Sequence, residues 1–299
     1  MHAVALATLI LAGMAQAQGP ALAPDPGAFR LSVSVDLVVV NATVRDSKGR
    51  FAPELKQDDF EVYEDGVRQS IRVFQHEDVP VTVGLVVDHS GSMRPKMAEV
   101  IAGARAFVQY SNPQDEMFVV NFNEHVTAGE RFTNRSDELA HAIDSAPVTG
   151  KTALYDALAL AQERVRGGAH PKKVLVVISD GGDNASAHTL AQVLKAAAQS
   201  NTAIYTVGIF SGEDEDRNPD VLRQLSRATG GDAFFPSEQT EVVEICERIA
   251  RDIRNQYTLG YVSSNAAENG GSRAIRVVAR TGKRTLAVRA RSGYLAGAK

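Results

Sequence analysis

The pattern of hydrophobic and polar residues changes twice along the chain. Residues 29–79 consist mostly of short stretches in which the two kinds alternate, which predicts β-strands and no helix. Residues 80–254 combine near-continuous apolar runs with longer stretches in which apolar residues recur every three or four positions. Residues 255–296 return to alternation. The sequence therefore predicts a central α/β region between two β-rich segments.

Two apolar runs in the central region, Val81–Val87 and Val174–Ile178, have the composition of strands that are buried on both faces of a parallel sheet. The other strands that we expect there are residues 117–122, 203–209 and 232–235, and the expected helices are residues 96–110, 137–145, 153–164, 189–199, 219–229 and 240–254. Because strands and helices alternate, the predicted fold class is α/β, with a doubly wound, mostly parallel sheet and helices on both of its faces.

The first β-rich segment predicts strands and a tight turn. Leu31–Val44 is long and rich in valine, which favours a strand. Phe60–Tyr63 and Ile71–Phe74 each alternate, and Asp65–Gly66 between them is typical of a hairpin turn. We therefore expect these two stretches to pair as a hairpin.

The last segment is β-rich as well, with expected strands at Tyr257–Tyr261, Ile275–Ala279 and Thr285–Ala290. A segment of about 40 residues rarely forms a stable β-domain by itself. We therefore expect the two β-rich segments to combine into one small β-sandwich in which the α/β region is inserted. Two separate β modules are the alternative.

The N-terminus has the pattern of an export signal. Ala3–Met14 is a short apolar segment, and the next three residues, Ala-Gln-Ala, match the cleavage motif of secretory signals. No Lys or Arg precedes this segment, so an apolar tail without a targeting role is the alternative. We expect residues 1–17 to be a signal peptide, residues 18–28 to be a flexible linker, and the protein to be periplasmic or secreted. Since no apolar run approaches roughly 20 residues, we expect no transmembrane span in the mature chain.

Composition narrows the range of partners. The 299 residues are 44% hydrophobic and 23% charged, which is ordinary for a soluble globular protein. The net charge is −4 and Lys and Arg are dispersed, so we expect no nucleic acid partner.

Cys246 is the only cysteine, which excludes an internal disulfide, and its helical spacing with Val242 and Ile249 predicts an inert core residue.

Polar residues follow the first buried strand at the point where it ends. Asp88, Ser90 and Ser92 stand at alternate positions directly after Val81–Val87. Open α/β folds bind ligands at the carboxyl ends of their strands, and carboxylate and hydroxyl oxygens suit Mg²⁺, Mn²⁺ or Ca²⁺. The same residues could equally cap the next helix. Taken alone, the motif leaves both interpretations open.

Two distant residues favour the metal interpretation. Val174–Ile178 is also followed by a carboxylate, Asp180, which reaches the same sheet edge if both strands are central and parallel. Thr152 precedes a predicted helix beside that edge, where it could be a plain N-cap or could point its hydroxyl at a metal. The predicted divalent-cation site consists of Asp88, Ser90, Ser92, Thr152 and Asp180.

These motifs resemble the von Willebrand factor type A (VWA) family over residues 80–254. The resemblance rests on DxSxS after an apolar strand, TALYDAL at the start of a helix, and a strand that ends in SDG. Together the three form the metal-ion-dependent adhesion site of that family. The resemblance implies that Ser90 and Ser92 bind the metal through their hydroxyls and that Thr152 binds directly or through water. It also implies that Asp88 and Asp180 act mostly through water.

The segments outside this region resemble bacterial exported VWA proteins of a kind frequent in acidobacteria. This second resemblance rests on VDLVVVNATVRDSKGRF, on DFEVYEDG, and on a tail that contains YTLGY. It implies an architecture and an exported location but no defined biochemical activity.

The expected function is metal-dependent binding of a protein partner, in adhesion or scaffolding. The resemblance implies a Mg²⁺ ion, with Mn²⁺ or Ca²⁺ possible, that bridges to an Asp or Glu of the partner. We expect no enzymatic activity, because no positioned base accompanies the motif. A metal-dependent hydrolase and a purely structural metal site are the alternatives.

Three weaker motifs allow other interpretations. Gly150–Thr152 resembles part of a nucleotide-binding loop, but residue 145 is Ser where that motif requires Gly, so we expect no nucleotide. The acidic stretch with Asp214, Asp216, Asn218 and Asp220 is expected to be a solvated loop, with a second cation site as the alternative. His89 is expected to point away from Ser90 and Ser92.

Overall fold

The computed structural model describes residues 37–297 except residues 53, 130, 211–215, 239, 266–270 and 283. Asp36–Lys299 form one compact unit. The expected signal peptide and linker lie outside the described residues. Among the helices that the structure describes, none has the length and apolar character to cross a membrane.

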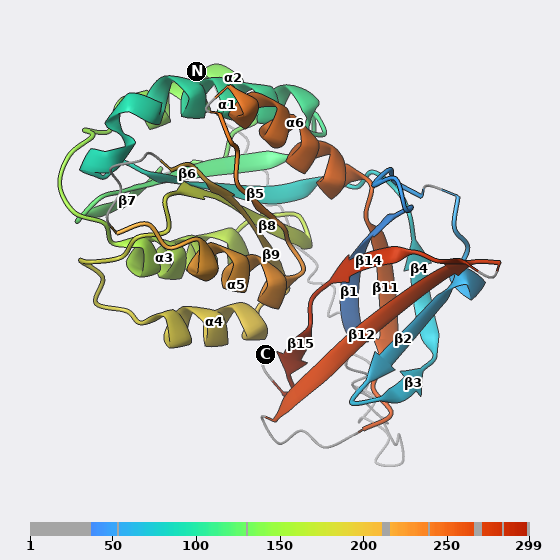
Figure 1. Cartoon of the computed structure of the whole chain (residues 1–299). Helices are drawn as coiled ribbons and strands as arrows, with labels where there is room; N and C mark the ends of the chain where they lie inside the picture. The colour runs from blue at the N-terminus through green and yellow to red at the C-terminus, as the bar shows by residue number, and fades with distance from the viewer. Residues whose placement is uncertain are drawn as a thin grey trace, which may run out of the picture. The chain divides into compact units, whose positions relative to one another are not determined.

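The central sheet has six strands in the order β10-β9-β8-β5-β6-β7 (Figure 1). Its strands are β5 (Val81–Asp88), β6 (Glu116–Phe122), β7 (Val126–Ala128), β8 (Lys172–Ser179), β9 (Thr202–Gly208) and β10 (Ala233–Phe234). Neighbouring strands are parallel except β7, which pairs antiparallel with β6. Every residue of β5 is buried, as the continuous apolar run predicted. β7 was not predicted, because three residues are too few to show a period.

Six α-helices cover the two faces of this sheet (Figure 1). They are α1 (Met97–Tyr110), α2 (Ser136–Asp144), α3 (Leu154–Arg166), α4 (Leu190–Gln199), α5 (Pro219–Thr229) and α6 (Glu241–Arg254). Residues of α1, α2 and α6 share one hydrophobic core with one face of the sheet, and residues of α3, α4 and α5 share a second core with the other face. The α/β, doubly wound, mostly parallel architecture is confirmed.

A small β-sandwich flanks the α/β region. One of its sheets has the order β14-β1-β11-β4 and the other has the order β13-β12-β2-β3, with β15 paired to β12. The strands are β1 (Leu37–Arg45), β2 (Phe60–Glu64), β3 (Val67–Gln69), β4 (Ile71–Gln75), β11 (Tyr257–Val262), β12 (Ser272–Thr281), β13 (Arg284–Thr285), β14 (Ala287–Ala290) and β15 (Gly293–Leu295). Strands that precede the α/β region pair with strands that follow it, as in Val40 opposite Leu259 and Val62 opposite Val277.

The predicted hairpin is correct in its turn but wrong in its second strand. Asp65 and Gly66 have φ values of 48° and 83°, and they join β2 to β3. Ile71–Gln75 instead forms β4 and pairs with β11 in the opposite sheet. From there Phe74 contacts Phe60 of β2 across the core, with ring centroids 5.6 Å apart. The alternating pattern therefore identified a core-facing strand but not the sheet to which it belongs.

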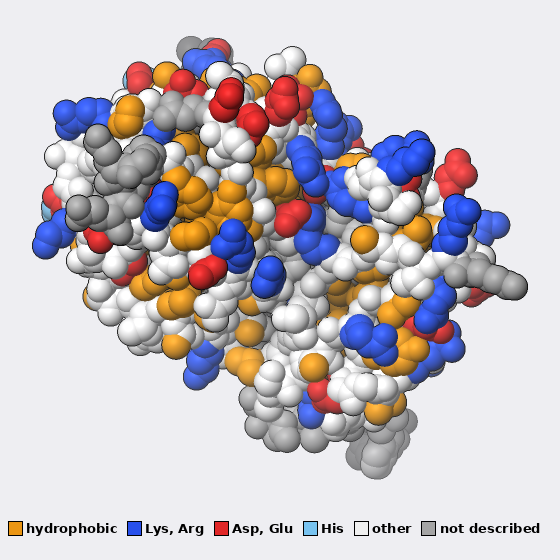
Figure 2. All heavy atoms as spheres, viewed as in Figure 1, with side chains coloured by type: hydrophobic (Ala, Val, Ile, Leu, Met, Phe, Trp, Pro, Cys, Tyr) orange, Lys and Arg blue, Asp and Glu red, His pale blue; other side chains and the backbone are white. Residues whose placement is uncertain are grey.

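Charged side chains are interspersed over the visible surface (Figure 2), but the carboxylate of Asp252 is completely buried. Asp252 of α6 forms ion pairs with Arg45 of β1 and Arg289 of β14, and Arg289 also pairs with Asp232. A buried charge is tolerated only when it is paired and hydrogen-bonded. This network therefore joins the last helix of the α/β region to two strands of the β-sandwich.

We expect Asp252→Ala to lower the free energy of unfolding by about 3–5 kcal/mol, because it leaves two largely buried guanidinium groups without their shared partner. Asp220→Ala is the matched control, since the Asp220 side chain is 90% exposed and pairs only with Arg223 of the same helix. The control variant should lose less than about 1 kcal/mol. Urea denaturation of the purified variants measures both values, and equal losses would contradict the assigned role of Asp252.

Candidate metal centre

The two apolar strands that carry the candidate aspartates are neighbours in the sheet. β5 and β8 run parallel and in register, with Val87 opposite Ile178, so both end at the same edge. Asp88 at the end of β5 is fully buried, and Asp180 directly after β8 is 4% exposed. Parallel pairing therefore brings together two carboxylates that are far apart in the sequence.

Hydrogen bonds connect these carboxylates to the two candidate serines. The Ser90 and Ser92 Oγ atoms are 3.2 Å apart, and Ser92 Oγ donates to Asp180 Oδ2 at 2.6 Å. The backbone N–H of Ser90 donates to Asp88 Oδ1 at 2.8 Å. We refer to Asp88, Ser90, Ser92 and Asp180 as the edge cluster. Four of the five predicted site residues thus belong to one hydrogen-bonded group.

Helix capping does not account for these side chains. Ser90 precedes a short 3₁₀ helix, Gly91–Lys96, but its side chain makes no capping hydrogen bond. Thr152 is not the N-cap of α3, because Ala153 occupies that position. The capping alternative that the sequence left open is therefore not the geometry that the structure adopts.

Thr152 is placed beside the edge cluster by backbone hydrogen bonds. Its N–H donates to Asn184 Oδ1 at 2.9 Å, and its carbonyl accepts from the N–H groups of Asn184 and Ala185. The Gly91 N–H donates to Gly150 O at 3.2 Å, which joins the loop before Thr152 to the serine loop. Thr152 is 6% exposed, and its hydroxyl has no hydrogen bond within the described part of the chain.

Two residues that sequence reasoning did not assign also hold the site in place. Ser179, the last residue of β8, donates its hydroxyl to Asp88 Oδ2 at 2.6 Å. Asn184 accepts from the Thr152 N–H through its Oδ1 and donates its Nδ2 to Asp216 Oδ2 at 2.8 Å. The sequence could have indicated Ser179 by its position, because it is the last residue of the buried strand before Asp180.

The electrostatics of the cluster favour a cation. The pKa of the Asp88 carboxyl is raised to about 6, because the effects of burial and of the neighbouring Asp180 charge outweigh the hydrogen bonds from Ser179 and Ser90, which lower it. Within the described residues, no Lys, Arg or His forms an ion pair with either carboxylate. Buried carboxylates without a positive partner are the donors that a hard divalent cation requires.

The donor set decides which metals fit. Among the described residues, no group of three or more His, Cys, Asp or Glu side chains comes together to hold a metal. The edge cluster and Thr152 instead offer three hydroxyls and two carboxylates. This oxygen set fits Mg²⁺, Mn²⁺ or Ca²⁺ better than a metal that prefers nitrogen or sulfur.

The structure describes part of the acidic stretch and the cysteine that the sequence analysis considered. Asn218 is the N-cap of α5 and accepts from the Val221 N–H at 3.3 Å. Asp214 lies outside the described residues, so the second cation site has no structural test. Cys246 is buried, and burial raises the pKa of its thiol to about 12, as expected for an inert core residue.

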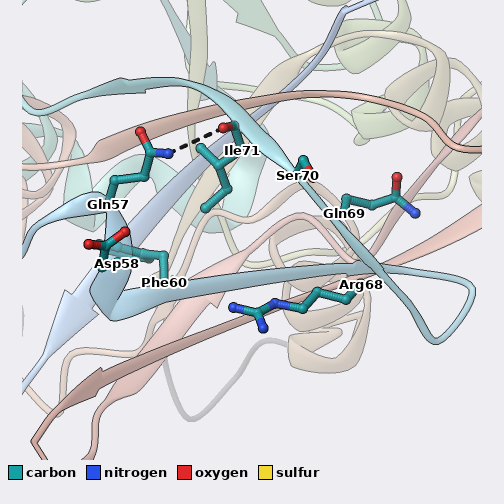
Figure 3. A pocket seen from close by; sticks show the side chains of 7 residues that line it. All are labelled: Gln57, Asp58, Phe60, Arg68, Gln69, Ser70 and Ile71. Atoms are coloured by element: carbon teal, nitrogen blue, oxygen red, sulfur yellow. Dashed lines mark hydrogen bonds between the residues drawn. The ribbon is translucent and has the colours of Figure 1, made fainter.

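A pocket of about 600 Å³ lies on the β-sandwich, and Figure 3 shows the side chains that line it. Gln57 and Asp58 line it together with residues of β2, β3 and β4, and Gln57 Nε2 donates to Ile71 O at 3.2 Å. None of the lining residues belongs to the edge cluster. The pocket and the candidate metal centre are therefore separate features.

Comparisons with solved structures identify proteins of the same fold. A von Willebrand factor type A protein from Catenulispora acidiphila has 14% sequence identity over 87% of this chain and 74% of its own, with a TM-score of 0.53. Proximal thread matrix protein 1 from the mussel byssus has 16% identity over 64% of this chain and 49% of its own, with a TM-score of 0.51. The vWF domain of the type V pili tip protein Mfa5 from Porphyromonas gingivalis has 14% identity over 59% of this chain and 95% of its own, also with a TM-score of 0.51.

The comparison with family models identifies the family. Curated protein sequences give no match. The family model for the von Willebrand factor type A domain matches residues 82–248, a range that runs from the second residue of β5 into α6 and contains every candidate metal residue. Since this match covers more than half of the chain, the protein belongs to the von Willebrand factor type A domain family.

Proposed function

We propose that this protein binds a partner protein through a divalent cation held at the edge cluster. VWA domains are typically protein-interaction modules, and many bind a divalent metal. The observation that carries the proposal is the hydrogen-bonded cluster itself, in which a buried carboxylate lies beside two serine hydroxyls and lacks a positive partner. We take Mg²⁺ as the cation, because hydroxyl and carboxylate oxygens match its preference.

The hydroxyl geometry suits this role. Two neighbouring ligands of an octahedral Mg²⁺, each at about 2.0–2.1 Å, lie about 2.9 Å apart. The Ser90 and Ser92 Oγ atoms are 3.2 Å apart and need only a small adjustment. Because Ser92 donates its proton to Asp180, its oxygen lone pairs remain available to a cation. Thr152 is proposed as the third hydroxyl, directly or through water.

The aspartates orient this site and do not act as bases. Asp88 accepts from the Ser90 N–H and the Ser179 hydroxyl, and Asp180 accepts from the Gly182 N–H and the Ser92 hydroxyl. All four carboxylate oxygens are therefore occupied. The bound cation supplies a positively charged position for an Asp or Glu of the partner. We accordingly infer a binding module of the adhesion or scaffolding kind and no enzymatic activity.

We also propose that the protein works in the periplasm or outside the cell. The export-signal pattern of residues 1–17 supports this location. A structural neighbour, the Mfa5 domain, belongs to a pilus tip protein. An extracytoplasmic location gives a module of this kind access to partners on envelope or surface structures.

We expect Mg²⁺ to stabilise the protein and Ser92→Ala to abolish this effect. At a Mg²⁺ concentration one hundred times the dissociation constant, the gain is about 2.7 kcal/mol. Ser92→Ala removes one ligand and leaves Asp180 without its hydroxyl donor. Thermal unfolding with Mg²⁺ or with EDTA measures the difference. Ser200→Ala, which removes a hydroxyl at the end of α4, is the control and should keep the full gain. If Mg²⁺ stabilised Ser92→Ala as much as the wild type, this result would contradict the assignment of Ser92 as a ligand.

We expect partner capture to require the cation. The wild-type protein should capture a partner from periplasmic and membrane extracts in Mg²⁺ and lose it in EDTA, and Ser92→Ala should fail in both. Replacing the acidic residue of the identified partner by its amide should abolish binding. An identical captured set with and without EDTA would refute the adhesion function, and turnover of a substrate without any partner would indicate the hydrolase alternative.

We expect the Mg²⁺ effect to grow with pH. The pKa of Asp88 is about 6 in the folded protein, against a reference value of 3.8 for Asp. The folded metal-free protein therefore binds an extra proton between these pH values, and its stability falls as the pH rises from about 4 to about 6. Mg²⁺ competes with that proton, so the Mg²⁺-induced rise in Tm should be larger at pH 7.5 than at pH 5. Asp88→Asn should remove the contribution of this carboxyl to the pH dependence of the metal-free protein, and an equal Mg²⁺ effect at both pH values would contradict this account.

A further inference from the structure

The turn between β6 and β7 binds the chain on both sides of Thr152. The Asn123 carbonyl accepts from the Ala153 N–H at 2.8 Å, directly after Thr152. The Glu124 carboxylate accepts from the Lys151 N–H at 2.6 Å, directly before Thr152. Thr152 therefore lies between two backbone N–H groups that the same turn holds. Because one of the two acceptors is a side chain, its contribution can be tested by substitution.

The turn is itself held by hydrogen bonds. The Asn123 N–H donates to the His125 carbonyl at 3.1 Å, and the His125 N–H donates to Asn123 Oδ1 at 2.8 Å. The Phe122 carbonyl, at the end of β6, accepts at 2.7 Å from the N–H of His89, which belongs to the loop of the candidate serines. The turn is thus tied to the serine loop as well as to the chain around Thr152.

The Glu124 carboxylate fills the space that a side chain at position 150 would need. A Cβ atom at Gly150 would overlap this carboxylate, and Gly150 has a φ of 81°, which also favours glycine. The Gly150 carbonyl accepts from the Gly91 N–H at 3.2 Å. Glu124 is therefore packed against the segment that joins the serine loop to Thr152.

The position of Thr152 depends on contacts of this kind. Mg²⁺ requires near-ideal octahedral geometry, so a hydroxyl on a loop is a good ligand only when its backbone is held in place. Thr152 precedes the N-cap of α3, so the helix does not fix it. Asn184 holds the N–H and the carbonyl of Thr152 itself, and Glu124 holds the preceding N–H, that of Lys151.

We propose that Glu124 is a positioning residue of the candidate metal centre, which holds the Thr152 hydroxyl in place for the cation through its hydrogen bond to the Lys151 N–H. This inference rests on the proposed function. It gives a role in cation binding to a surface residue outside the sequence motifs. In this role Glu124 acts as a hydrogen-bond acceptor and not through its negative charge.

The test measures the dissociation constant for Mg²⁺ from the dependence of Tm on Mg²⁺ concentration, with the full chain. We expect Glu124→Ala to weaken Mg²⁺ binding about tenfold, at the low end of the loss caused by removing a group that orients a metal ligand. Glu124→Gln keeps an oxygen that accepts from the Lys151 N–H, so its dissociation constant should stay within about threefold of the wild type.

Glu241→Ala is the matched control. Glu241 accepts from the Ser237 backbone N–H at 2.8 Å, so this substitution removes the same charge and the same kind of hydrogen bond at the start of α6. It should leave the dissociation constant for Mg²⁺ unchanged even if it lowers Tm in EDTA. If Glu124 had only a structural role, Glu124→Ala would give this same result.

Gly150→Ala provides an independent check, because its Cβ atom displaces the Glu124 carboxylate. Once the carboxylate is displaced, its removal has little further effect. Glu124→Ala should therefore weaken Mg²⁺ binding less in the Gly150→Ala background than in the wild type. Losses that add up in the double variant would show that Glu124 does not act on this segment and would overturn the proposal.

The outcomes separate the two proposals. Mg²⁺ stabilisation of the wild type with an unchanged dissociation constant in Glu124→Ala overturns the positioning role and leaves the proposed function standing. Equal losses in Glu124→Gln and Glu124→Ala also overturn it, because they would show that the charge attracts the cation. Absence of Mg²⁺ stabilisation in the wild type overturns the proposed function and the positioning role with it.

Discussion

The structure of the candidate site depends on one constraint, which is that a carboxylate buried at the end of a parallel strand must have partners. Asp88 ends a strand that is covered on both faces, so water cannot solvate it well. Its two oxygens are satisfied by Ser90 and Ser179, which ties the end of β5 to the end of β8. The loops that carry Ser92, Thr152 and Asn184 are in turn held by hydrogen bonds to one another. Among the residues that the structure describes, no cationic side chain pairs with Asp88 or Asp180.

Much of this site could be predicted from the sequence, because two physical rules act together. Strands buried on both faces read as unbroken apolar runs, and parallel strands end at a common edge. These rules located Asp88, Ser90, Ser92 and Asp180, which the structure brings into one cluster. They could not locate the role of Asn184. That role depends on where the loop places its backbone, and asparagine is common in any turn.

The β-sandwich shows where local patterns stop being informative. Asp65–Gly66 specified a tight turn, because both residues tolerate positive φ. The pattern of Ile71–Phe74 specified a half-buried strand, but its pairing with β11 depends on residues almost two hundred positions away. Asp252 poses the same difficulty. In the sequence it is an ordinary polar position of a helix, and its burial becomes intelligible only when Arg45 and Arg289 lie beside it. Contacts between residues so far apart in the sequence produce no periodic pattern in the local sequence, so they cannot be predicted from it.

The pairing of β1 also has a consequence for how the chain reaches its folded state. Both neighbours of β1 in its sheet, β11 and β14, come after the whole α/β region. During synthesis or export from the N-terminus, the valine-rich β1 therefore emerges early and has no strand to join until the last part of the chain arrives. Closing so long a loop is slow unless the intervening region has already become compact. The α/β region thus acts as an internal folding template. Its own collapse brings Arg45 and Asp252 close together, and until then β1 is an open edge that invites pairing with other chains.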